Sequence, residues 1–134
     1  QANHFSVTRQ VHFSQQNPSQ SLDMVICLNG LPVITFELKN NLTNQNVNHA
    51  KRQYREDRDP KEPLFRFARC LVHMAVDDQE VWMTTELRGP KTFFLPFNRG
   101  QGYGKPIWEA VNHGRGNPPN PDGLMTAAGK DMED

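Results

Sequence analysis

Long apolar runs, a signal sequence and an excess of one charge are all missing from this 134-residue chain. No stretch reaches the roughly 18–20 consecutive apolar residues of a membrane helix. The first ten residues lack the basic and then apolar pattern of a secretory signal. We therefore expect neither a membrane span nor a secretory signal in this chain. The 15 basic and 15 acidic residues balance, so the net charge gives no argument for a polyanionic partner.

Cysteine is also scarce, because only Cys27 and Cys70 are present and each lies in a separate apolar run. Two cysteines cannot supply a four-ligand zinc motif or a disulfide framework. We expect both to be buried, reduced thiols, which predicts a cytoplasmic protein. A single bridge between two strands stays open as the alternative.

The length is that of one domain, and the core must be concentrated in a few segments. Hydrophobic residues make up 36% of the chain and the mean hydropathy is -0.74. Because the chain begins with Gln1, we expect it to be a piece of a larger subunit. Residues 1–98 are expected to form the core. Residues 99–134 hold seven of the nine glycines, which predicts a Gly/Pro-rich loop region and the start of a linker.

Strand patterns precede and follow one helical pattern. We expect strands over 4–13, 22–28, 32–39, 71–76 and 81–87, and a hairpin at Asn29-Gly30, a strong turn signal. Residues 44–57 are expected to be helical, because Val47, Ala50 and Tyr54 recur at helical spacing. This order predicts an α/β fold with a central mixed β-sheet flanked by helices.

The two hairpin strands carry charged residues on one face. Glu37 and Lys39 alternate with apolar residues, so their side chains share a face. A two-residue turn would set Asp23 across from Phe36, whereas a three-residue loop with a bulge sets it opposite Glu37. We predict the second register, because it gathers the charged side chains on one face and the larger apolar ones on the other.

Carboxylates facing each other across two strands repel unless a cation lies between them. Magnesium is the natural occupant, since it is usually held by one or two carboxylates plus a substrate phosphate. Manganese is expected to substitute. Lys39 would then stabilise developing negative charge or help lower the pKa of the attacking water. A Glu-x-Lys triplet alone is common on exposed strands, where it contributes little. Only its combination with Asp23, apolar strands that look buried on both faces and a following helix is specific.

Several segments carry motifs of one known family. The most specific is Asp23 followed by Glu37-Leu38-Lys39, and the others lie at residues 3–10, 22–32, 36–40, 50–54, 57–60, 63–65, 84–87, 94–98 and, after an insertion-like stretch, 114–118. Together they resemble the PD-(D/E)xK nucleases, and more narrowly the nuclease domain of the R (restriction) subunit of type I restriction enzymes. The resemblance implies a restriction-endonuclease-like fold.

The resemblance also implies a role for each matching residue. Asp23 and Glu37 would be metal ligands, Lys39 the catalytic lysine, and Gln53 the glutamine of a Gln-x-x-x-Tyr motif. The chain departs from the family pattern in three ways. Leu22 precedes Asp23 where the motif name has proline. Asp57 occupies the tyrosine position, while Tyr54 directly follows the glutamine. The acidic ligand that many members take from an upstream helix is expected to have no counterpart, because the chain starts at the first expected strand.

Basic residues exceed acidic ones by three between positions 51 and 69. The plain interpretation is a solvated helix face with mixed ion pairs. As part of a nuclease, the candidate DNA-binding residues are Arg52, Arg55 and Arg99, although Arg99 is equally suited to cap a loop. His73 and Met74 lie in an apolar run, and we interpret them as core or near-core residues.

The leading hypothesis is a magnesium-dependent endonuclease domain that cleaves double-stranded DNA as part of a type I restriction-modification complex. Its implied partners are the methylation and specificity subunits. No GxxxxGK[ST] loop is present, so ATP would act only through a motor domain outside this chain. Two alternatives stay open: a non-catalytic scaffold for DNA contact or subunit docking, and a stand-alone resolvase or repair nuclease. The segments at 84–85 and 95–98 favour the restriction subunit.

Overall fold

The computed structural model describes residues 2–78 and 80–97. Its elements, in chain order, are β1 (Phe5–His12), β2 (Ser21–Leu28), β3 (Leu31–Leu38), the short 3-10 helix η1 (Asn41–Thr43), α1 (Val47–Glu56), β4 (Val72–Val76), β5 (Val81–Thr84) and β6 (Leu95–Pro96). The predicted loop region at 99–134 and the candidate Arg99 lie outside the described residues.

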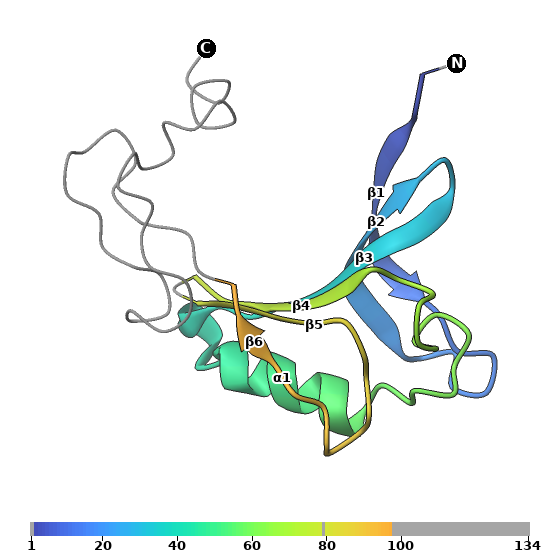
Figure 1. Ribbon diagram of the computed structural model, residues 1–134. Coiled ribbons are helices and arrows are strands. Elements are labelled where there is room, and N and C mark those ends of the chain that lie inside the picture. The colour runs from blue at the N-terminus through green and yellow to red at the C-terminus, as the bar shows by residue number, and fades with distance from the viewer. Residues whose placement is uncertain (1, 79, 98–134) are drawn as a thin grey trace, which may run out of the picture.

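One six-stranded sheet contains all of these strands, and their order in the sheet follows the chain from β1 to β6. The pairing of β3 with β4 is parallel, and the other four pairings are antiparallel. The parallel pairing requires a crossover connection, which α1 supplies. Figure 1 shows α1 against one face of the sheet, while the β2–β3 turn extends away from the helix. The predicted α/β fold with a mixed sheet is confirmed, with one α-helix in the described part of the chain.

The β2–β3 register is the one predicted for the charged residues, but the turn differs. Leu28 pairs with Leu31 around the two-residue turn Asn29-Gly30, and both turn residues have positive φ, at 51° and 82°. The register then shifts by one residue, so that Met24 pairs with Phe36. The expected three-residue loop was therefore wrong, because the shift comes from a bulge inside β3. Asn-Gly favours a two-residue turn, and the neighbouring Pro32 has no N–H to give the ladder.

The sheet face toward α1 is buried and partly polar. Val25, Thr35, His73 and Thr84 are cross-strand neighbours in β2, β3, β4 and β5, and all four are buried. In the next row, Glu37 on β3 pairs with Ala75 on β4, and Ala75 pairs with Trp82 on β5. Ala75, Ala50 and Tyr54 belong to the hydrophobic core. The core therefore lies between α1 and this face of the sheet.

The opposite face is apolar but incompletely covered. Its cross-strand neighbours are Met24, Phe36, Met74, Met83 and Leu95. Within the described residues, the first four are half-buried and Leu95 is exposed. The expectation that the apolar strands are buried on both faces is thus wrong for this part of the chain. Met74 is near-core as interpreted, and His73 is in the core.

Helix α1 begins three residues later than predicted, because Asn46 caps it. The Asn46 side chain accepts the N–H of Asn48 at 3.1 Å, and the His49 ring accepts the Asn46 N–H at 3.1 Å. Asp77, which follows β4, accepts the Val47 N–H at 2.8 Å. These contacts satisfy N–H groups that have no partner inside the helix. They also tie the start of α1 to the end of β4.

Three smaller expectations had mixed outcomes. Strand β5 ends at Thr84 rather than near residue 87, because the Thr84 hydroxyl donates to the Glu86 carbonyl at 3.0 Å and forms a local turn. Both cysteines are free thiols; Cys70 is buried, which raises the pKa of its thiol, whereas Cys27 is half-buried. None of the described helices is long and apolar enough to cross a membrane.

The tie between β4 and α1 predicts a measurable loss of stability. Asp77→Ala removes the acceptor for the Val47 N–H at 2.8 Å and for the Glu80 N–H at 2.6 Å. We expect the free energy of unfolding to fall by about 1–3 kcal/mol, measured by urea denaturation. Glu56→Ala, at the exposed end of the same helix, is the control and should change it by less than about 0.5 kcal/mol. Equal effects of the two substitutions would contradict the capping role.

Candidate functional site

The centre of the candidate site is the carboxylate of Glu37, which is completely buried. Its Oε1 accepts a hydrogen bond from Nε of Arg58 at 2.7 Å. Its Oε2 is buried without a hydrogen-bond partner among the described residues. Burial raises the pKa of Glu37 to about 7; Arg58 opposes this shift and the charge of Asp23 adds to it. A buried acid with one unpartnered oxygen is costly unless a proton or a cation compensates it.

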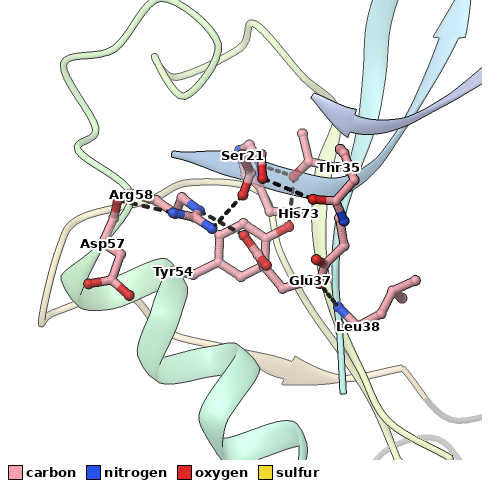
Figure 2. Close-up of polar contacts among 10 residues, drawn as sticks. Ser21, Thr35, Glu37, Leu38, Tyr54, Asp57, Arg58 and His73 are labelled. Atoms are coloured by element: carbon pink, nitrogen blue, oxygen red, sulfur yellow. Dashed lines mark hydrogen bonds and ion pairs between the residues drawn. The ribbon is translucent and has the colours of Figure 1, made fainter. Parts of the chain in front are cut away.

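Arg58 is the second buried charge of the site, with 3% of its surface exposed. Besides Glu37, its guanidinium donates to the backbone carbonyls of Ser21 at 2.9 Å and Asp57 at 3.4 Å. Figure 2 shows Arg58 reaching past the Tyr54 ring toward Glu37 and Ser21. One side chain therefore contacts β2, β3 and the end of α1.

Asp23 lies next to Glu37, as the predicted register requires. The Asp23 Oδ2 accepts the N–H of Leu38, the residue after Glu37, at 2.7 Å. The charge of Asp23 is also one cause of the raised pKa of Glu37. The two predicted carboxylates thus come from adjacent strands and meet at the end of β3.

Lys39 lies just after β3 and Gln53 lies on α1, and their connection to the two carboxylates is weaker than that of Arg58. Lys39 directly follows β3, its N–H donates to the Val76 carbonyl at 2.8 Å, and its charge acts to lower the pKa of Glu37. Gln53 is half-buried on α1. In residues 2–78 and 80–97, no hydrogen bond joins its side chain to either carboxylate. Its catalytic role stays a prediction.

A buried chain of hydrogen bonds lies beside the carboxylates. The Thr35 hydroxyl is 2.9 Å from the Tyr54 hydroxyl and 2.7 Å from Nδ1 of His73. Burial lowers the pKa of His73 to about 4, so its ring is neutral at pH 7. Burial, with the nearby charge of Glu37, raises the pKa of Tyr54, so its hydroxyl keeps its proton. This uncharged network fixes α1 against β3 and β4.

Sequence reasoning missed Arg58 and the network around Tyr54. In the sequence, Arg58 is one of several basic residues between positions 51 and 69, and nothing in its local pattern distinguishes it from its neighbours. Tyr54 had a signal, since its helical spacing placed it toward the core. The structure also separates it from Asp57. Tyr54 is buried against β3, whereas Asp57 is the exposed C-cap of α1.

The predicted DNA-binding arginines differ in their surroundings. Arg52 is exposed on α1. Arg55 is half-buried, donates from Nε to the Thr92 carbonyl at 3.1 Å, and lies 5.3 Å from the Phe94 ring centre. Arg55 therefore has a structural task, holding the segment before β6 against α1. Contact with DNA stays a prediction for both residues.

The residues at the site fit a magnesium ion with few protein ligands. In the described part of the chain, no group of three or more His, Cys, Asp or Glu side chains is placed to hold a metal. Asp23 and Glu37 would supply two carboxylates. The Oε2 of Glu37, which has no hydrogen-bond partner among the described residues, is available as a metal ligand. Magnesium is commonly held by one or two carboxylates with several waters. This donor set therefore suits it.

The buried His73 predicts a pH-dependent stability. The unfolded chain binds a proton at its ordinary pKa of 6.5, whereas the native chain binds it only near 4. Stability is therefore lost as the pH falls through this window, by about 3 kcal/mol in total. We expect the free energy of unfolding of His73→Gln to fall less than that of the wild type between pH 7.5 and 4, measured by urea denaturation.

The raised pKa of Glu37 acts with the opposite sign between pH 4.5 and 7. Glu37 is present in both proteins, so the difference between the pH profiles of the wild type and His73→Gln reports on His73. His4→Gln, at an exposed histidine, is the control and should behave as the wild type does. Identical pH profiles of His73→Gln and the wild type would show that His73 does not titrate as stated.

Comparison with known proteins identifies the family of the chain. A family model described as "Type I restriction enzyme R protein N terminus (HSDR_N)" matches residues 1–92. The match contains the whole candidate site, from Ser21 to His73. No curated protein and no solved structure matched the chain. Since the model covers more than half of the sequence, the chain belongs to the family of type I restriction enzyme R protein N termini.

Proposed function

We propose that this chain is a magnesium-dependent endonuclease domain of the PD-(D/E)xK type, with a restriction-endonuclease-like fold. It would cleave phosphodiester bonds of double-stranded DNA, with manganese able to substitute. The observation that carries the proposal is the buried Glu37, whose Oε2 has no hydrogen-bond partner among residues 2–78 and 80–97 and whose pKa is raised in part by the charge of Asp23. A buried, incompletely paired carboxylate needs compensation, and a divalent cation supplies it. Membership of a restriction-enzyme family supports the same function.

Each polar residue of the site has a distinct proposed task. Asp23 and Glu37 hold the cation. When bound, the cation supplies charge neutralisation at the phosphate and lowers the pKa of a water molecule. The ammonium of Lys39, close enough to act on the pKa of Glu37, stabilises the negative charge that develops on the phosphate. Gln53 is proposed to act from α1 at the edge of this cluster.

The proposed setting is a cytoplasmic type I restriction-modification complex. Double-stranded DNA, a methylation subunit and a specificity subunit are the proposed partners. Sequence specificity would come from the specificity subunit, since cutting the backbone requires no contact to base edges. ATP would be used by a motor domain outside the 134 residues.

The ion pair between Glu37 and Arg58 favours a second candidate, a non-catalytic scaffold. A guanidinium at 2.7 Å already gives Glu37 a cation from the protein itself. In that case the pair would hold the fold together, and the domain would serve DNA contact or subunit docking. The two candidates differ in whether the carboxylates bind a divalent metal.

Calorimetric titration with manganese and magnesium separates the candidates. We expect the wild type to bind, and Asp23→Asn and Glu37→Gln to lose binding, because each removes one of two ligands. Circular dichroism must show that both variants are folded. Glu56→Ala removes an exposed carboxylate that forms no ion pair or hydrogen bond with Asp23, Glu37 or Arg58 in the described part of the chain; it is the control and should bind normally. Binding that survives in both site variants, or no binding by the wild type, would leave the scaffold.

Cleavage tests the proposed role of Lys39. In the assembled restriction complex, Lys39→Ala should lower the rate of plasmid cleavage by about 10²–10³-fold, because it removes a charge that stabilises the transition state. ATP hydrolysis by the same complex should continue, since the proposed motor lies elsewhere. Unchanged cleavage would exclude Lys39 from catalysis.

A further inference from the structure

The guanidinium of Arg58 connects the segments that carry the candidate ligands. It donates to the carbonyl of Ser21, two residues before Asp23 on β2, at 2.9 Å. It donates to Oε1 of Glu37 on β3 at 2.7 Å. Its third contact, to the Asp57 carbonyl at 3.4 Å, is at the C-terminal cap of α1. We propose that Arg58 is a positioning residue that fixes the separation and orientation of the two candidate metal ligands, an inference that rests on the proposed function.

The enclosure of Arg58 distinguishes this role from DNA binding. Only 3% of its surface is exposed, and its guanidinium lies 5.3 Å from the ring centre of Phe13. A side chain so enclosed does not reach a phosphate at the surface. Arg58 therefore acts on the site through Glu37 and the Ser21 backbone.

The contact with Glu37 selects one carboxylate oxygen for a ligand. Nε of Arg58 donates a hydrogen bond to Oε1, and Oε2 is left without a hydrogen-bond partner among the described residues. A carboxylate held at one oxygen cannot rotate freely about its Cγ–Cδ bond. Arg58 thus presents Oε2 as the donor atom, in the way that outer contacts commonly orient metal ligands.

The planar guanidinium of arginine explains why a lysine cannot replace Arg58. Its Nε and Nη atoms are fixed in one plane and reach two strands together, whereas a lysine offers one compact ammonium. Arg58→Lys therefore keeps the charge but loses the simultaneous contacts to Ser21 and Glu37. This substitution separates positioning from simple charge compensation.

The test measures manganese affinity of this chain by calorimetry and DNA cleavage in the assembled complex. For Arg58→Lys we expect about a 10–100-fold weaker affinity for manganese, the usual effect of losing a contact that orients a ligand. We expect kcat for cleavage to fall while KM for DNA stays unchanged, because Arg58 does not touch DNA. Arg66→Lys is the matched control, since Arg66 is exposed and its Nε donates to the Lys61 carbonyl at 3.2 Å; it should behave as the wild type does.

Arg58→Gln, which keeps N–H donors without the charge, is measured beside Arg58→Lys so that a folded variant is available. Weaker manganese binding in folded Arg58→Lys, without tighter binding in Arg58→Gln, supports positioning; if Arg58→Lys does not fold, weaker binding in folded Arg58→Gln supports it. Wild-type affinity in Arg58→Lys, or tighter binding in Arg58→Gln, would overturn it, since Arg58 would then act only as a charge. A raised KM for DNA with unchanged manganese affinity would also overturn it. A wild type that binds no metal fails the proposed function itself, which is a distinguishable outcome.

Discussion

The buried ion pair between Glu37 and Arg58 holds together β2, β3 and the end of α1. Removing two charges from water costs several kcal/mol for each ion, and the attraction between them offsets this cost only with good geometry and further hydrogen bonds. Arg58 obtains those bonds from the backbones of Ser21 and Asp57. Glu37 does not obtain them fully, because its Oε2 has no partner among the described residues. The hydrogen-bonding capacity of the arginine is therefore better satisfied than that of the glutamate.

Helix α1 reaches the position that this pair needs through contacts at both ends. At its start, Asp77 binds the Val47 N–H; near its end, the Tyr54 hydroxyl binds Thr35 on β3. These contacts place the residues that follow the helix, including Arg58, over the strands that carry Asp23 and Glu37. Because the helix covers one face of the sheet, charged and polar side chains on that face are buried with partners, while the opposite face is apolar and half-exposed.

The nuclease and the scaffold candidates differ in whether the carboxylates bind a divalent cation. Membership among type I restriction enzyme R protein N termini places the chain in a restriction system. Within that setting, the nuclease and the scaffold share the same fold, the same adjacent carboxylates and the same ion pair. They differ in what compensates Glu37: a divalent cation at Oε2 with Arg58 at Oε1, or Arg58 alone. The chemistry of one carboxylate oxygen thus separates two kinds of protein.

Local sequence patterns were sufficient to predict the main strands, the helix and the face on which the charges lie. Alternation and apolar runs bounded by turn residues predicted β1 to β4, and helical spacing predicted α1. The grouping of charges on one face predicted the register that brings Asp23 to Glu37. The bulge inside β3, the short β6 and the partner of Glu37 depend on long-range packing and could not be predicted from these patterns. Periodicity records which way a side chain points relative to its own strand or helix. The partner of Glu37 lies 21 residues away, beyond a helix whose placement depends on β3 and β4, so no local pattern could identify Arg58.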